Sequence, residues 1–361
     1  MFVRALGLTV LVAWPITTAR AEPGRVTLTI VEQYAQALIK RGDPGTDVAV
    51  NGVENGLLLK LGTNYHFYTS IWTTPGWDFF GNAYWTSPDG IKWTLAKALH
   101  MPGPDRTGED VRTVFWEPIP VYDSLEERWN LFYASGRWPV PKGWDGRIWR
   151  AVSKMKGMDG IGGPWEECGE VNSGPHDSWE GRQGVSTWFP YFCGGRWLAF
   201  YGSSDAHTWW RQGLAESQDL KGPWKRMSNL NPVRLSGDLG EECPRVFRLH
   251  SGRYLCLFDV IKNPKDQNSK ATVLDPRPPG LFTHLAIGYS DSADGVHWSD
   301  ARYLFLRDDG KVWVKHMRCP VSFIEETDGT YTIYYTGMSE GFFKGFSGLG
   351  KIRVSVREAG S

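Results

Sequence analysis

Short apolar runs, rich in aromatic side chains and separated by polar turns, recur along the whole chain. Five of them share one pattern and end near a small or acidic polar residue, at residues 65–70, 129–135, 197–203, 254–259 and 331–336. Runs of this length and composition, bounded by Gly, Asp and Pro, predict β-strands. The pattern returns about every 65 residues, and a unit of that size cannot bury both of its faces alone. The units must therefore pack on one another.

Each repeat has the same order of elements. A strand that begins near a proline comes first, and a Gly- or Asp-rich hairpin turn leads into the aromatic strand. A variable loop, a third strand, a turn and a tryptophan follow, as in Ser87-Pro88-Asp89-Gly90-Ile91-Lys92-Trp93. We expect the Asp-Gly pair to form the turn and the tryptophan to pack between repeats. Five such units predict an all-β fold, a five-bladed β-propeller.

The two ends of the chain complement each other in this prediction. The fifth repeat stops after its third strand, near Val356, and lacks an outer strand. Residues 25–30 alternate like a strand, so we expect the N-terminal segment to supply the outer strand and close the propeller. Residues 31–40 have the spacing of a short amphipathic helix.

The first residues have the pattern of a secretory signal peptide. Arg4 precedes an apolar stretch, and Ala19-Arg20-Ala21 forms an Ala-x-Ala cleavage site. The apolar stretch is too short to span a membrane, and Pro15 interrupts it. We therefore expect residues 1–21 to be removed, and residues 22–361 to form one exported domain, secreted or periplasmic and without a membrane partner.

Charge and cysteine content narrow the possible partners. Lys plus Arg equals Asp plus Glu at 40 each, so the formal net charge is zero and nothing indicates binding of nucleic acid. The five cysteines leave at least one thiol unpaired. Cys243-Pro244 and Cys319-Pro320 hold equivalent places in neighbouring repeats, so both a disulfide between them and two buried free thiols are open.

Tryptophans gather where a propeller would present its variable loops. The loops after the aromatic strands lie at the same end as the starts of the first strands, because successive strands of a blade are antiparallel. Trp72, Trp138 and Trp209 are on these loops, and Trp116 and Trp188 stand at first-strand starts. Aromatic residues on loops are harder to assign to a core, and indole rings stack on the C–H faces of sugars. We expect them to bind an oligo- or polysaccharide, while some fill gaps between blades.

Acidic residues recur at the starts of the first strands. Counting three residues back from the proline or its equivalent gives Glu54, Glu117 and Glu241, with Glu242 beside the last. First strands line the axis of a propeller, so these carboxylates should converge. Glycoside cleavage needs one protonated acid for the leaving oxygen and one ionised carboxylate across the sugar ring, and a third acid can raise the pKa of the donor. Each glutamate could instead pair with an arginine such as Arg245, or bind an ion.

These repeats resemble the five-bladed propeller glycosidases, glycoside hydrolase families 32 and 43 and their relatives (invertases, arabinanases and xylosidases). Glu241-Glu242-Cys243-Pro244 resembles the Glu-Cys-Pro motif of the invertase-like members, where the glutamate is the general acid. Val53-Glu54-Asn55-Gly56 and Trp116-Glu117-Pro118 stand where the first-blade and second-blade aspartate motifs would fall. The resemblance implies a secreted glycoside hydrolase for a furanoside or related glycan. In it, Glu54 is base or nucleophile, Glu242 is the acid with Glu241 as rival, and Glu117 modulates the acid's pKa.

The resemblance also bears on the fifth repeat, at His316 and Arg318. In some family 43 members a fifth-blade histidine helps to hold a calcium ion, so a structural calcium at His316 is implied, with no cofactor required. Arg318, at the same strand start, is a candidate substrate-binding residue.

Two other functions fit the same residues. Both first acids are Glu where the families use Asp, and the acid motif opens the fourth repeat instead of the third. A carbohydrate-binding propeller without catalysis accounts for these departures, since one extra CH₂ group displaces a carboxylate from its working position. A sialidase-like enzyme is suggested by the Ser87–Trp93 segment, although sialidases have six blades.

Overall fold

The structure is a computed structural model that describes residues 25–75, 80–101, 112–140, 143–174, 176–181, 184–203, 210–233, 235, 240–261, 285–307, 310–341 and 344–359. The predicted signal peptide, residues 1–21, lies outside these ranges. Within them the chain is built of β-strands with one short 3-10 helix, η1 (Met158–Gly162), and no α-helix. The all-β prediction is confirmed.

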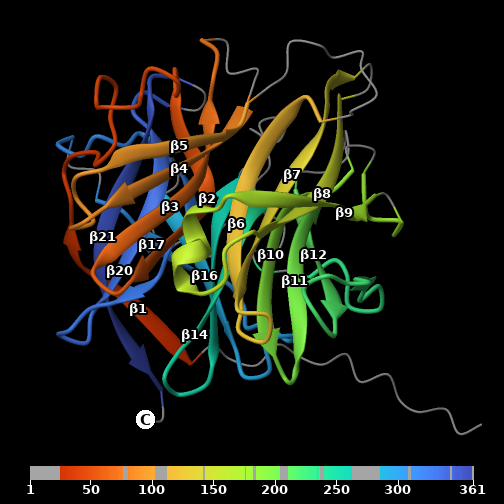
Figure 1. The fold of residues 1–361 in the computed structure, drawn as a ribbon. Helices are drawn as coiled ribbons and strands as arrows, with labels where there is room; N and C mark the ends of the chain where they lie inside the picture. Colours follow the sequence, from red (N-terminus) through yellow and green to blue (C-terminus); the bar gives the residue numbers. More distant parts are fainter. Residues whose placement is uncertain are drawn as a thin grey trace, which may run out of the picture.

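The strands form antiparallel units that follow one another along the chain (Figure 1). Unit I contains β2 (Gly52–Leu61), β3 (Asn64–Trp72), β4 (Phe80–Ser87) and β5 (Thr94–His100). Unit II contains β6 (Val114–Asp123), β7 (Arg128–Val140), β8 (Gly143–Ser153) and β9 (Trp165–Ser173). Unit III contains β10 (Ser186–Cys193), β11 (Arg196–Ser203), β12 (Arg211–Ser217) and β13 (Lys225–Arg226). Unit IV contains β14 (Gly240–Arg248), β15 (Tyr254–Ile261), β16 (Ala286–Ser292) and β17 (Arg302–Phe305).

Unit V combines both ends of the described chain. It contains β18 (His316–Pro320), β19 (Ile324–Glu325), β20 (Tyr331–Met338), β21 (Ser347–Glu358) and the N-terminal strand β1 (Val26–Gln33). β1 runs antiparallel to β21, with Val26 opposite Glu358. A single parallel pair, Gly52 opposite Ser347, joins unit V to unit I.

The predicted helix at residues 31–40 is wrong. β1 continues to Gln33, and the N–H groups of Tyr34 and Leu38 then donate to the carbonyls of Lys351 and Leu349. The segment therefore follows β21 without forming a helix, because pairing with an available strand edge overrides a weak helical periodicity. Asp291 of unit IV fixes the start of β1 by accepting bonds from the N–H groups of Arg25 and Val26.

The aromatic run of each repeat is the second strand of its unit. Neighbouring units cover both faces of these strands, so successive residues are buried on opposite sides. The pairs with no exposed surface are Phe67 and Tyr68, Phe132 and Tyr133, Phe200 and Tyr201, Leu257 and Phe258, and Tyr334 and Tyr335. Burial on both faces explains why the runs are continuously apolar instead of alternating.

The tryptophan that closes a repeat packs against the second strand of the preceding unit. The ring pairs are Trp165 with Tyr68, Trp224 with Phe132, Trp298 with Phe200 and, from unit I to unit V, Trp93 with Tyr334. The Asp-Gly turns form as expected: Asp89 Oδ1 accepts bonds from the N–H groups of Ile91 and Lys92 at 2.8 Å.

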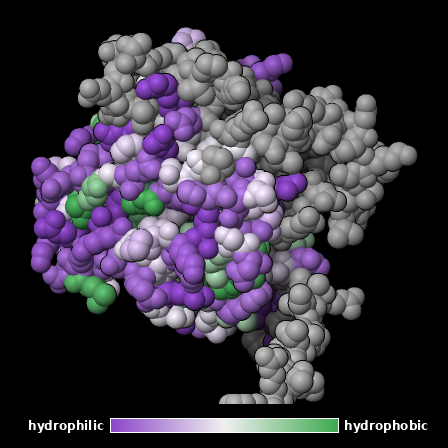
Figure 2. Space-filling model, turned by 90° about the vertical axis from the view of Figure 1, so that its right-hand side faces the viewer, coloured by the Kyte–Doolittle hydropathy of each residue, from purple (hydrophilic) through white to green (hydrophobic). Residues whose placement is uncertain are grey.

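The outer surface differs from this aromatic interior. On the side of the molecule that Figure 2 shows, the described surface is mainly hydrophilic, and its hydrophobic areas are small and separate. No helix among the described residues is both long enough and apolar enough to cross a membrane.

Candidate active site

The first strand of every unit carries a β-bulge at the same place. The register shifts directly after Glu54 in β2, Trp116 in β6, Ser186 in β10, Glu242 in β14 and Met317 in β18. A bulge adds a residue to one strand and turns its side chain away from the ladder. The register therefore aligns Glu54 with Glu242, not with Glu241, and it places Glu117 one position further on, inside its bulge.

The residues inside these bulges have an unusual backbone. Asn55, Glu117, Thr187 and Cys243 have φ values between 51° and 53°. Non-glycine residues in this region carry strain of about 1–3 kcal/mol each and persist only where the surroundings fix them. Glu117 is thus itself strained, and the strained Asn55 and Cys243 directly follow Glu54 and Glu242.

Arg318 of β18 pairs with three carboxylates, two near the starts of β2 and β14 and one near the end of β15. Its Nη2 atom lies 2.7 Å from Glu54 Oε1 and 3.1 Å from Glu242 Oε2. Its Nη1 atom donates to Asp259 Oδ2 at 3.0 Å, from the end of the neighbouring strand β15. All four side chains are nearly excluded from solvent. Units I, IV and V therefore meet in one buried ion-pair cluster, which we call the Arg318 cluster (Glu54, Glu242, Asp259 and Arg318).

A second arginine holds Glu117. Arg245 Nη2 donates to Glu117 Oε1 at 2.7 Å, and both side chains are completely buried. Arg245 also donates through Nε to the carbonyl of Gly56, and its guanidinium lies 5.3 Å from the centre of the Phe189 ring. This one side chain thus connects units I, II, III and IV.

Glu241 faces a different part of the molecule. Its Oε1 atom accepts a bond from the N–H of Leu235, and its backbone carbonyl accepts one from Gln212 Nε2. The structure therefore brings Glu54, Glu242 and Arg318 together, with Glu117 behind Arg245, and it leaves Glu241 outside the Arg318 cluster.

Burial and neighbouring charges shift the pKa values of the acidic residues in and near the cluster. Burial raises the pKa of Glu242 to about 8; Arg318 opposes this rise, and the charges of Asp259 and Glu54 add to it. Burial also raises the pKa of Asp259 to about 6, again against the charge of Arg318. Complete burial raises the pKa of Glu117, and Arg245 acts in the opposite direction. Glu242 is thus a carboxyl group that holds its proton near neutral pH, the state that a general acid requires.

Glu54 offers a carboxylate oxygen that is not used in pairing. Its Oε1 atom accepts from Arg318, whereas Oε2 is buried and has no hydrogen-bond partner among the described residues. A buried acceptor without a partner is costly and points to a group that is satisfied in another state of the site.

Asp259 is a site residue that the sequence reasoning missed. It ends the aromatic strand of the fourth repeat, where the other repeats carry Ser or Thr at or next to the same position. The register places it directly opposite Glu242. An acid in a place otherwise held by a small hydroxyl residue was the available signal.

The predicted sugar-binding tryptophans have different positions. Trp72 and Trp188 are buried: Trp72 packs on Phe80, and Trp188 lies between Tyr201 and Trp224. Trp116 is partly exposed and donates its Nε1 hydrogen to Ser186 Oγ at 2.7 Å. Trp209 and the side chain of Trp138 lie outside the part of the chain that the structure describes.

The metal prediction concerns His316, which is buried at the start of β18. Among the described residues, no group of three or more His, Cys, Asp or Glu side chains could hold a metal ion. In the Arg318 cluster, the guanidinium stands where converging carboxylates would otherwise surround a cation. A calcium ion at His316 stays a prediction from the sequence.

All five cysteines are free, and four of them are buried. Cys243 and Cys319, which flank Glu242 and Arg318 in the sequence, lie in the same hydrophobic cluster, and their side chains are hydrogen-bonded to each other. Of the two states left open by the sequence, the structure has two buried thiols.

Neither a protein-family model nor a curated protein matches this chain. Solved structures do. Zg3597, a family 117 glycoside hydrolase of the marine bacterium Zobellia galactanivorans, is 15% identical with a TM-score of 0.57, covering 92% of this chain and 91% of its own. A structure titled "Glycoside hydrolase" has a TM-score of 0.65 at 14% identity, covering 90% and 92%. The α-L-arabinofuranosidase PaAbf62A of Podospora anserina, solved with cellotriose, has a TM-score of 0.56 at 14% identity, covering 92% and 97%.

The chain is similar in fold to the β-propeller glycoside hydrolases. At these identities the likeness concerns the fold, and the chemistry has to be argued from the site.

Proposed function

We propose that this protein is a glycoside hydrolase whose reaction takes place at the Arg318 cluster. The observation that carries the proposal is the pairing of two unlike carboxyl groups on one guanidinium. Glu242 has its pKa raised to about 8, and Glu54, 2.7 Å from Arg318 Nη2, keeps one oxygen without a partner among the described residues. A protonated acid and an accepting carboxylate are the two groups that glycoside cleavage uses.

Glu242 is the proposed general acid. Its proton passes to the glycosidic oxygen as the bond to the sugar breaks, so the leaving group departs as an alcohol. Glu54 is the proposed base or nucleophile. Its Oε2 atom either takes a proton from a water molecule as that water attacks the anomeric carbon, or attacks the anomeric carbon itself to form a glycosyl ester that water then hydrolyses.

Arg318 and Asp259 are proposed to prepare these two groups. Arg318 donates to both Glu54 and Glu242 and so fixes their orientation. Asp259 adds negative charge beside Glu242, which favours the protonated form. Glu117, held by Arg245 and excluded from solvent, has a positioning role.

We propose that units I to V are the five blades of one propeller and that β1 closes the ring. The tryptophan contacts support this order, because each described pair links one unit to the preceding one and Trp93 links unit I back to unit V. The pairing of β1 with β21 supports the closure.

The proposed substrate is a furanoside or related glycan, and the proposed location is outside the cytoplasm. PaAbf62A, similar in fold, is named as an arabinofuranosidase. The signal-peptide pattern of residues 1–21 supports export.

A second candidate is a carbohydrate-binding propeller without catalysis. One observation favours it: the guanidinium of Arg318 pairs with both Glu54 and Glu242, as in a structural ion-pair network. Charged clusters of this kind also shift pKa values where no chemistry takes place.

Activity of residues 22–361 against aryl furanosides, aryl pyranosides and plant and bacterial glycans separates the two candidates. Glu242→Gln and Glu241→Gln are assayed in parallel, because the two residues are adjacent and only Glu242 belongs to the Arg318 cluster. A hydrolase loses turnover in Glu242→Gln and keeps it in Glu241→Gln. Glycan binding without turnover in all three proteins supports the second candidate.

A further inference from the structure

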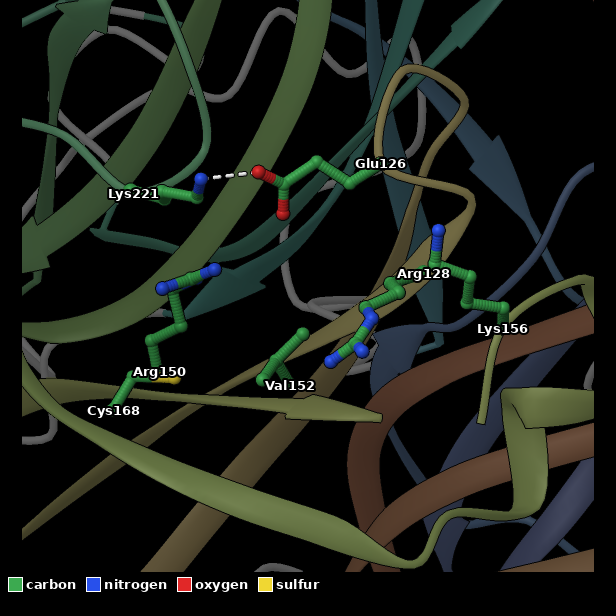
Figure 3. A pocket seen from close by; sticks show the side chains of 7 residues that line it. All are labelled: Glu126, Arg128, Arg150, Val152, Lys156, Cys168 and Lys221. Atoms are coloured by element: carbon green, nitrogen blue, oxygen red, sulfur yellow. Dashed lines mark ion pairs between the residues drawn. The ribbon is translucent and has the colours of Figure 1, made fainter. Parts of the chain in front are cut away.

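A second charged site lies at the other end of unit II. Glu117 is near the start of β6, whereas Arg128 follows the turn at the end of that strand. A pocket of about 450 Å³ opens there, and its lining residues are Glu126, Arg128, Arg150, Val152, Lys156, Cys168 and Lys221 (Figure 3). We call it the basic pocket.

Strand register places the pocket between two units. Asn130 is opposite Val152, and Phe132 is opposite Arg150, so these side chains share one face of unit II. Phe132 on that face contacts Trp224 of unit III. Lys221, from the turn before β13, enters the pocket from the unit III side. The basic pocket is therefore the end of the gap between units II and III, lined there by long basic side chains instead of aromatic rings.

The charges in the pocket are not balanced. Four of the seven lining residues are basic and one is acidic, and that one, Glu126, is paired with Lys221 (Figure 3). Within the described part of the chain, no carboxylate forms an ion pair with Arg128, Arg150 or Lys156. Three like charges around one cavity repel each other, and a bound anion removes that repulsion.

The arginines are held in position before any ligand binds. Arg150 is only 7% exposed, and its Nε atom donates to Asn130 Oδ1 at 2.7 Å, which fixes the plane of the guanidinium. Arg128 makes a longer contact, 3.4 Å from Nη1 to the carbonyl of Ser153. In Figure 3 the two guanidinium groups lie on either side of Val152, with Lys221 and Glu126 along the upper edge. Fixed guanidinium groups with a neighbouring ammonium group form a recognition site for an oxyanion.

We propose that the basic pocket binds an oxyanion carried by a glycan, a uronate carboxylate or a sulfate ester, as a second site separate from Glu54 and Glu242. The volume favours a sugar-borne group over a free ion, because it falls in the range of about 300–1,000 Å³ typical of small-molecule sites. The oxyanion follows from the charges and their geometry; its attachment to a glycan rests on the proposed function.

Titration calorimetry with four probes tests the proposal: sodium sulfate, an oligogalacturonate, a sulfated galacto-oligosaccharide and a neutral arabino-oligosaccharide. The proteins are the wild type, Arg128→Gln, Lys156→Gln and, as a charge-matched control on an exposed turn of unit I, Lys92→Gln. We expect an anionic oligosaccharide to bind, the affinity to fall about tenfold in Arg128→Gln and Lys156→Gln, and Lys92→Gln to match the wild type. Added salt should weaken the binding.

Cys168 supplies a local readout in the same pocket. It is exposed while the other four thiols are buried, so bound ligand should slow its alkylation by iodoacetamide. The proposal that this pocket binds an oxyanion is wrong if no anionic probe binds, or if Lys92→Gln loses as much affinity as Arg128→Gln and Lys156→Gln. Binding of inorganic sulfate alone overturns its assignment to glycans. Turnover of neutral substrates by the wild type, unchanged in Lys92→Gln, reports on the proposed hydrolase function independently.

Discussion

Glu242 Oε2 lies 3.1 Å from Arg318 Nη2, yet burial and neighbouring acids raise the pKa of this carboxyl to about 8. An arginine contact ordinarily keeps a carboxylate ionised. Here three carboxyl groups share one guanidinium, so the single positive charge is divided and the cluster retains a proton near neutral pH.

Asp259→Asn should shift the pH dependence of the reaction. In the wild type, the proton on Glu242 is present below pH 8 or so and is lost as the pH rises through the pKa of about 8, so kcat/KM should fall on the alkaline side. Without the negative charge of Asp259, the positive charge of Arg318 acts more strongly on Glu242, and the pKa of Glu242 falls. The alkaline limb of a kcat/KM profile should therefore move to lower pH, and an unmoved limb would exclude this role for Asp259.

Glu117→Gln should lower the free energy of unfolding. It leaves the completely buried Arg245 without its carboxylate, and breaking a buried pair in this way typically lowers the free energy of unfolding by about 3–5 kcal/mol. Glu216→Gln, which removes a partly exposed partner of Arg196, serves as the control, with a loss of about 1 kcal/mol or less. Urea unfolding measures both, and equal losses would contradict the structural role of Arg245.

Asp291→Asn should loosen the attachment of β1. Asp291 accepts bonds from the N–H groups of Arg25 and Val26 and pairs with Arg253 and Arg302. We expect the free energy of unfolding to fall by about 3 kcal/mol, and amide hydrogens of β1 to exchange faster.

The stabilisation that Asp291 provides should depend on pH. Burial opposes ionisation of Asp291, but the bond from Arg253 and those from the backbone N–H groups hold its pKa below the usual value. Its contribution is therefore present above the unfolded pKa and is lost as the pH falls through the folded pKa. The difference between Asp291→Asn and the wild type should shrink in acid, and a difference independent of pH would count against the ionised form.

Much of the fold could be predicted because the repeats bury both faces of one strand. Pairs such as Phe67 and Tyr68 are apolar in succession, which marks that strand in every unit. The site could be predicted only in part. Counting back from the proline places Glu241 beside Glu54. Proline does not hold the same position in every bulge, because Arg245 and not Pro244 corresponds to Leu57, and the register therefore aligns Glu54 with Glu242. Asp259 contributes from the second strand, which no count along first strands would reach.

Tertiary contacts account for the remaining differences. Residues 31–40 have a helical spacing, but β21 offers backbone groups to pair with, and the segment follows β21 without forming a helix. Trp188 stands at a first-strand start, which predicts that it binds sugar, yet Tyr201 and Trp224 cover it. Spacing along one strand cannot tell which neighbouring unit will cover a side chain.

The central claim is that Glu242 protonates the leaving group, and a leaving-group series in Glu242→Gln tests it most directly. A good leaving group, with a conjugate-acid pKa of about 4, hardly needs a proton, whereas one with a pKa of about 10 does. With matched dinitrophenyl and phenyl glycosides, Glu242→Gln should lose about 10²–10⁴-fold on the phenyl substrate and far less on the dinitrophenyl one, and Glu241→Gln should follow the wild type. Equal losses of Glu242→Gln on both substrates, or no loss on either, would contradict the assignment of Glu242 as the acid.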